Sequence, residues 1–127
     1  MTQPASILVV DDNTDNRRLV ERMLKRRGIA LIAHAESAAE CLRALEVRSF
    51  DVILMDISMP EVSGVELCQI VRRNPHGKDV RIVACTAHAS KKDAESFLQT
   101  GFDSVLTKPF LMDELYKAIG ADPTVTP

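Results

Sequence analysis

The sequence predicts a single-domain, doubly wound α/β fold, in which a five-stranded parallel sheet carries helices on both faces. Short aliphatic runs alternate with longer segments of helical periodicity along the chain. Parallel strands that are buried on both faces form such continuous apolar runs, and helical crossovers join them. The length of 127 residues suits one domain with a closed core. We therefore expect a single unit of five strands and five helices with its core in residues 6–120.

The first half of the chain alternates in the order strand, helix, strand, helix, strand. The first apolar run is aliphatic and stops at a pair of aspartates. The following segment places apolar side chains, Leu19 among them, on one helical face and stops at Gly28, a residue suited to a helix C-terminus. Ser37 opens the second helix with capping-box spacing. The expected strands cover residues 7–10, 29–33 and 52–55, and the expected helices begin at residues 13 and 37.

The second half continues the alternation with three helices and two strands. Ser63 begins a helix with capping-box spacing, and the segment 74–77, Asn-Pro-His-Gly, breaks it. Ser90 begins the next helix in the same way, and apolar residues four apart from Leu111 onward predict the last one. The expected strands cover residues 81–85 and 103–107, and residues 121–127 are expected to form a flexible tail.

Composition excludes several functional classes. The net charge of −2 gives no electrostatic attraction to nucleic acid or to an anionic membrane. The three cysteines, Cys41, Cys68 and Cys85, show no CxxC spacing, so we expect small buried apolar side chains and no disulfide frame or zinc site. The N-terminus lacks the basic region of a signal peptide, and no apolar run is long enough to span a membrane. These features predict a cytoplasmic protein.

Polar side chains follow four of the five predicted strands. Asp11 and Asp12 follow the first strand, Asp56 ends the third, Thr86 follows the fourth and Lys108 follows the fifth. Ligands bind open parallel sheets at the carboxyl ends of the strands, so these side chains are expected to share one crevice. Three carboxylates close together require a cation or a shared proton at neutral pH. Because every candidate ligand is an oxygen, the set favours Mg²⁺, with Mn²⁺ as the alternative hard ion.

Such a crevice is suited to a phosphoryl group. A divalent cation and Lys108 would neutralise phosphoryl oxygens while Thr86 donates a hydrogen bond. Asp56 is then the candidate nucleophile, because carboxylates form aspartyl phosphates.

With these residues in place, the chain resembles the receiver domains of bacterial two-component signalling. The similarity spans residues 6–120 and implies the flavodoxin-like strand order 2-1-3-4-5. The motifs that carry it are Asp11-Asp12, Leu54-Met55-Asp56, Met59-Pro60, Gly64, Thr86-Ala87 and Lys108-Pro109-Phe110.

The resemblance implies a role for each site residue. Asp56 accepts a phosphoryl group from the phosphohistidine of a kinase or phosphotransfer protein. Mg²⁺ is held by Asp12, Asp56 and the backbone carbonyl of Ser58, and Asp11 reaches it mainly through water. Lys108 contacts the phosphoryl group, and its bond to the following proline is expected to be cis.

The resemblance also implies how phosphorylation is transmitted. Thr86 moves toward the phosphoryl oxygen, and the fourth helix, fifth strand and fifth helix present the change to a protein partner. Dimerisation of phosphorylated chains through the last two helices is a further expectation from the family. Val105 occupies the position where many receivers carry an aromatic switch residue, so the usual readout does not transfer. Ser58 and His88 occupy positions that influence the lifetime of the aspartyl phosphate, without indicating its length.

Four functions compete at this stage. A stand-alone response regulator is preferred, because the chain has an initiating Met, a short tail and no room for an output domain. The start Asp11-Asp12-Asn13, followed by Asn16-Arg17, instead resembles receivers of hybrid histidine kinases and phosphorelays. A hydrolase of the haloacid dehalogenase type would need an acid where Ser58 stands. A flavin carrier would need a first loop that accepts phosphate, which two aspartates would repel.

Overall fold

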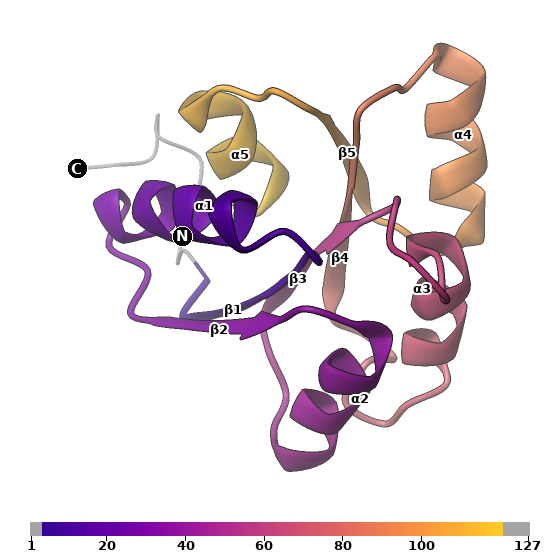
Figure 1. Cartoon of the computed structure of the whole chain (residues 1–127), viewed down its shortest axis with the longest axis horizontal. Coiled ribbons are helices and arrows are strands. Elements are labelled where there is room, and N and C mark those ends of the chain that lie inside the picture. The colour runs from indigo at the N-terminus through magenta and orange to yellow at the C-terminus, as the bar shows by residue number, and fades with distance from the viewer. Residues whose placement is uncertain (1–3, 121–127) are drawn as a thin grey trace.

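The computed structural model describes residues 4–120 and contains one parallel sheet between two helical layers (Figure 1). The spatial order of the strands is β2-β1-β3-β4-β5, and every neighbouring pair is parallel. This order confirms the doubly wound prediction. The strands are β1 (Ser6–Val10), β2 (Leu31–Ala35), β3 (Val52–Asp56), β4 (Arg81–Thr86) and β5 (Ser104–Thr107).

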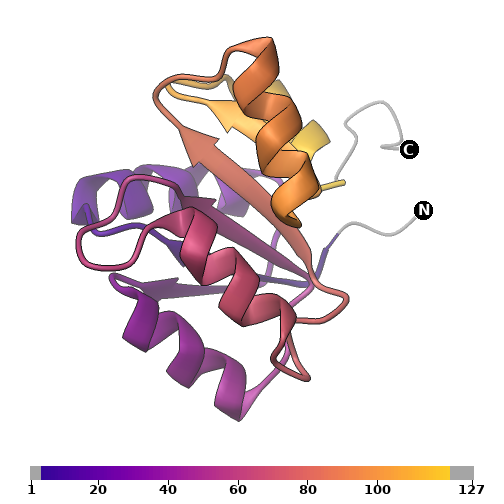
Figure 2. The ribbon, with the colours of Figure 1, turned by 90° about the vertical axis from the view of Figure 1, so that its right-hand side faces the viewer.

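Helices α1 and α5 cover one face of the sheet, and α2, α3 and α4 cover the other (Figures 1 and 2). None of the helices in the described range is long and apolar enough to cross a membrane. The helices are α1 (Thr14–Arg26), α2 (Ala38–Val47), α3 (Gly64–Arg72), α4 (Lys91–Thr100) and α5 (Met112–Ala118).

The period-two alternation of the strands divides the core between these two layers. In β1, Leu8 and Val10 belong to the cluster under α2 and α3, whereas Ile7 and Val9 belong to the cluster under α1 and α5. All five residues of β3 are buried, as the unbroken apolar run predicted. Cys41, Cys68 and Cys85 are buried in the same two clusters, which confirms their expected role as small apolar side chains.

The second strand begins two residues later than predicted, at Leu31 instead of residue 29. Gly28 has a φ of 88° and donates to the Lys25 carbonyl, while Ile29 donates to the Leu24 carbonyl. These two hydrogen bonds form the Schellman motif at the end of α1, with Ile29 packed in the core. The apolar residue that was assigned to the strand therefore closes the preceding helix.

The three predicted serine N-caps are present, but only one of them forms both hydrogen bonds of a capping box. The hydroxyls of Ser37 and Ser63 each accept from the backbone three residues on, whereas only Ser90 forms the complete capping box, with Asp93. The carboxylate of Glu40 instead accepts from the backbone of Glu36, one residue before the cap. The cap serines therefore mark the helix starts correctly.

The predicted tail at 121–127 lies outside the described residues.

Arg72, the last residue of α3, connects two loops at the amino ends of the strands, opposite the carboxylates. Its Nε and Nη2 donate to the Gly101 carbonyl at 3.1 and 2.6 Å. Its Nη1 donates to the carbonyls of Gly77 and Val80, and Nη2 pairs with Asp103 at 2.8 Å. One guanidinium thus satisfies backbone carbonyls from two separate connections.

We predict that Arg72→Met lowers the free energy of unfolding by about 2–4 kcal/mol, because it leaves these partly buried acceptors without a donor. Arg73→Met is the matched control, since the Arg73 side chain is exposed and should change stability by roughly 0.5 kcal/mol or less. Urea unfolding of both variants measures the difference. Equal losses in the two variants would contradict the role assigned to Arg72.

Candidate functional site

The carboxyl ends of β1 and β3 bring three carboxylates together. Asp11 follows β1 directly, and Asp56 is the last residue of β3. One carboxylate oxygen from each of Asp11, Asp12 and Asp56 lies within 4.8 Å of the other two. Asp11 and Asp56 are buried and Asp12 is exposed, so the cluster opens to solvent through Asp12. The adjacent parallel strands thus create the acidic group that the sequence predicted.

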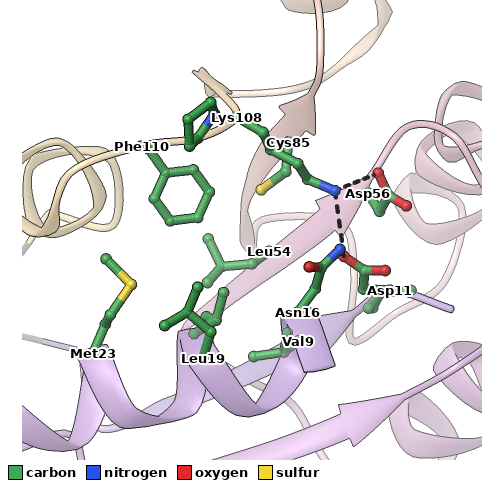
Figure 3. A pocket seen from close by; sticks show the side chains of 13 residues that line it. Val9, Asp11, Asn16, Leu19, Met23, Leu54, Asp56, Cys85, Lys108 and Phe110 are labelled. Atoms are coloured by element: carbon green, nitrogen blue, oxygen red, sulfur yellow. Dashed lines mark hydrogen bonds and ion pairs between the residues drawn. The ribbon is translucent and has the colours of Figure 1, made fainter. Parts of the chain in front are cut away.

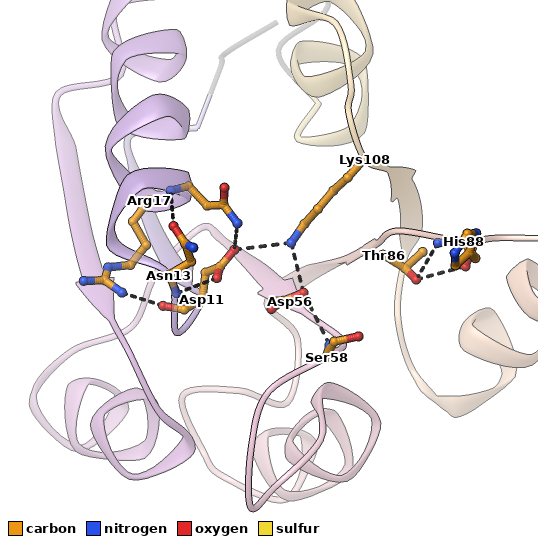
Figure 4. Close-up of polar contacts among 9 residues, drawn as sticks. Asp11, Asn13, Arg17, Asp56, Ser58, Thr86, His88 and Lys108 are labelled. Atoms are coloured by element: carbon orange, nitrogen blue, oxygen red, sulfur yellow. Dashed lines mark hydrogen bonds and ion pairs between the residues drawn. The ribbon is translucent and has the colours of Figure 1, made fainter.

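Lys108 bridges the two buried carboxylates from the loop after β5 (Figure 4). Its ammonium lies 3.1 Å from Asp56 Oδ1 and 3.4 Å from Asp11 Oδ2. Burial alone would lower the pKa of Lys108, but the hydrogen bond to Asp56 and the two negative charges raise it above its ordinary value. The Lys108-Pro109 peptide bond is cis, as the resemblance implied.

The start of α1 fixes the position of Asp11 (Figure 4). The backbone N–H of Asn13 donates to Asp11 Oδ1 at 2.9 Å, and the Asn16 amide approaches Oδ2 at 3.4 Å. The buried guanidinium of Arg17 donates to the Asp11 backbone carbonyl at 2.6 Å and to the Thr14 hydroxyl at 3.2 Å. Sequence reasoning noted Asn13, Asn16 and Arg17 only as a resemblance and missed this positioning role.

Thr86 ends β4, and its hydrogen bonds differ from those expected in the phosphorylated state. The Thr86 hydroxyl donates to the His88 carbonyl at 2.9 Å and accepts from the His88 N–H at 3.3 Å. It is therefore engaged with its own loop. The Ser58 N–H donates to Asp56 Oδ1 at 3.3 Å.

Gly64 is the residue against which the backbone of Asp56 packs. A Cβ added at this position would lie 2.5 Å from the Asp56 carbonyl oxygen and 2.8 Å from Ile57 Cα. Such distances are far inside van der Waals contact, so only glycine allows α3 to begin so close to the end of β3.

Burial raises the pKa of Asp56 above its ordinary value, and the negative charge of Asp11 acts in the same direction. The hydrogen bond from Lys108 opposes this effect without cancelling it. A group whose pKa is raised on folding binds protons more tightly in the folded state. Ionised Asp56 therefore lowers stability at pH values above its folded-state pKa.

We predict that Asp56→Asn raises the free energy of unfolding at pH 7 in Mg²⁺-free buffer, because the amide is isosteric and uncharged. The difference should shrink as the pH falls through the folded-state pKa toward the ordinary carboxyl value of 3.8. Urea unfolding across this range measures it. Asp15→Asn is the control, because Asp15 is exposed in the first turn of α1, where a negative charge is favourable. Destabilisation by Asp56→Asn at pH 7 would contradict the account that burial and the charge of Asp11 disfavour the ionised carboxylate.

A cavity of about 360 Å³ adjoins the carboxylates between α1 and the loop after β5 (Figure 3). Leu19 lies on the apolar face of its helix that the sequence indicated, but it is 54% exposed and lies at the wall of this cavity. Its face is therefore only partly covered by the rest of the protein. Helical periodicity identifies a face, but the neighbouring elements decide how much of that face is covered.

Comparisons with a family model and with known protein sequences point to the same family. A model of the response regulator receiver domain matches residues 7–120. The chain is 39% identical over 113 residues to an uncharacterized 14.6 kDa protein of Leptolyngbya boryana, covering 89% of this chain and 86% of that protein. It is 38% identical over 122 residues to hybrid signal transduction histidine kinase I of Dictyostelium discoideum, covering 91% of this chain but only 7% of the kinase.

Solved structures agree in fold. The chemotaxis protein CheY4 of Vibrio cholerae superposes with a TM-score of 0.84 at 29% identity, covering 91% of this chain and 96% of that one. The receiver domain of sensor histidine kinase PA1611 from Pseudomonas aeruginosa PAO1 has a TM-score of 0.79 at 33% identity, covering 94% and 99%. That domain was solved with a magnesium ion coordinated in its active site cleft.

The parallel α/β fold and the carboxylates at its sheet edge define a domain of two-component signalling. Specifically, the chain belongs to the response regulator receiver domain family. Receiver domains work with histidine kinases and are typically phosphoacceptors without a catalytic function of their own. The hydrolase and flavin-carrier alternatives are therefore not retained.

Proposed function

We propose that this chain accepts a phosphoryl group on Asp56 from a histidine kinase or histidine phosphotransfer protein, in a Mg²⁺-dependent reaction that switches its protein contacts. The observation that carries the proposal is the convergence of three carboxylates at the carboxyl ends of β1 and β3, two of which pair with Lys108. A structural ion pair would need one carboxylate for this lysine, whereas the site has three. The surplus negative charge calls for a cation.

The donor set fits Mg²⁺. Asp12, Asp56 and the backbone carbonyl of Ser58 would hold the ion directly, and Asp11 would act through water. All of these donors are oxygens, and the exposure of Asp12 leaves room for the water ligands that Mg²⁺ retains. The bound ion would supply electrostatic stabilisation of the phosphoryl oxygens. The related PA1611 receiver, with its coordinated magnesium, supports this assignment.

The protein residues supply the nucleophile and the positioning groups. A carboxylate oxygen of Asp56 forms the new bond to phosphorus while the P–N bond of the donor phosphohistidine breaks, and the imidazole leaves with that electron pair. Lys108, already within 3.1 Å of Asp56, turns to the phosphoryl oxygens and neutralises charge there. The Thr86 hydroxyl exchanges its bond to the His88 carbonyl for one to a phosphoryl oxygen.

Incubation with Mg²⁺ and acetyl phosphate is predicted to add one phosphoryl group to the parent chain, measured by intact-protein mass. Asp56→Asn should acquire none, because it lacks the nucleophile. The control Asp79→Asn should behave as the parent. Asp79 is exposed just before β4, at the amino ends of the strands and away from the carboxylates. Phosphorylation of Asp56→Asn to the same extent as the parent would contradict the proposed acceptor.

The movement of Thr86 is proposed to change the face formed by α4, β5 and α5, where a downstream protein would bind. Leu98 on α4 and Leu111, directly before α5, are exposed apolar side chains at these elements. Position 105 on β5 holds a valine and no aromatic side chain, so we expect the change to pass through the loop that carries His88, whose carbonyl accepts from Thr86. A phosphorylation-dependent homodimer would use the same elements.

A stand-alone regulator is the preferred form, and the L. boryana relative of similar length supports it. The hybrid kinases among the relatives support the second candidate, a receiver module within a longer kinase or phosphorelay protein. The stand-alone form predicts an immunoblot band near 14.0 kDa in the source cells. A band only at the mass of a kinase would overturn it.

Sedimentation with and without beryllofluoride tests the homodimer, which an unchanged mass would exclude.

A further inference from the structure

The proposed phosphoryl chemistry uses one end of the cavity beside the carboxylates and leaves its apolar part without a role. It lies between α1, the sheet and the loop after β5, and most of its wall is apolar (Figure 3). Leu19 forms part of its exposed side. The apolar wall is formed chiefly by Val9, Leu19, Met23, Leu54, Pro109 and Phe110.

The polar groups of the cavity are gathered at one end. Asp11 and Asp56 contribute two negative charges there and Lys108 contributes one positive charge, so the end carries a net charge of −1. Both side-chain contacts to Asp11 Oδ2, from Lys108 and from Asn16, are 3.4 Å long. These contacts are longer than normal hydrogen bonds, so this oxygen can still accept a donor from a ligand.

The volume of the cavity suits a small molecule. A dry apolar cavity of about 150 Å³ is large enough to hold benzene, and this one, at about 360 Å³, is more than twice that size. Ligand pockets of proteins typically begin at about 300 Å³ and combine apolar walls with a few polar groups. This arrangement selects for a ligand with an apolar body and a single polar head.

We propose that the cavity binds a small amphiphilic cation, such as an arylalkyl amine. Its ammonium group would lie at Asp11 and Asp56, and its apolar body would pack against Leu19, Met23 and Phe110. The net negative end favours a cationic head over a neutral or anionic one. Because the ammonium and a divalent cation would use the same carboxylates, each would weaken the binding of the other. Such a ligand would therefore antagonise the loading of the site with Mg²⁺.

This inference goes beyond the phosphoacceptor function, and its test needs no phosphodonor. The probe is 4-phenylbutylamine, titrated into the protein in Mg²⁺-free buffer and followed by amide NMR shifts. The neutral analogue 4-phenylbutanol lacks the charge, and n-butylamine lacks the ring. We expect saturable binding of the probe, with both analogues weaker by about tenfold or more, because each loses one of the two contributions.

Two tryptophan variants test where the probe binds. Leu19→Trp places a large ring at the cavity, whereas Leu98→Trp is the matched control on α4, because the two leucines are 54% and 48% exposed. Both positions are at the surface, so both variants should fold. Leu19→Trp should weaken probe binding by about tenfold or more, while Leu98→Trp should leave it unchanged. Addition of Mg²⁺ should raise the apparent Kd of the amine for the parent chain.

The proposal is overturned by any of four results: no saturable shifts, equal affinity for amine and alcohol, equal effects of the two tryptophan variants, or no effect of Mg²⁺ on the amine Kd. None of these results would contradict the phosphorylation of Asp56 by acetyl phosphate, which is measured separately by mass. Failure of that phosphorylation would likewise leave amine binding intact.

Discussion

The repulsion among Asp11, Asp12 and Asp56 is the constraint on which the rest of the structure depends. One carboxylate oxygen from each lies within 4.8 Å of the other two, and Lys108 offsets only one of the three charges. The fold holds them together because β1 and β3 are adjacent, parallel and buried, so their carboxyl ends cannot move apart. Gly64 adds a close contact to the backbone of Asp56. The site is thus arranged for a cation and a phosphoryl group, at a cost to the stability of the protein without them.

The first helix contributes to the site in two ways. Its N-terminal turn fixes Asp11 through the backbone of Asn13 and the guanidinium of Arg17. Its next turn carries Leu19, which is largely exposed and borders the apolar cavity beside the same carboxylates. Charge and apolar surface therefore meet at one end of α1. This juxtaposition connects the proposed phosphoacceptor site with the proposed binding of an amphiphilic cation.

Much of this arrangement could be predicted from the sequence. Unbroken apolar runs located the buried strands, and the polar residues after them predicted the carboxylate site because parallel strands end at one edge. The sequence could not show that Ile29 closes α1 instead of starting β2, because an apolar residue after glycine suits both roles. Arg17 contacts the carbonyl of Asp11, just before its own helix, and Arg72 contacts the carbonyl of Gly101, which is 29 residues away in the sequence. Only the folded structure brings those carbonyls within reach of a guanidinium.

The most direct test of the account is a crystal structure of the protein grown with Mg²⁺ and beryllofluoride, which mimics a phosphoryl group. The account predicts beryllofluoride bonded to a carboxylate oxygen of Asp56, Mg²⁺ beside Asp12 and Asp56, and the Thr86 hydroxyl turned away from the His88 carbonyl. A structure from saturating beryllofluoride in which Asp56 still pairs only with Lys108, and the acidic cluster holds no ion, would contradict it.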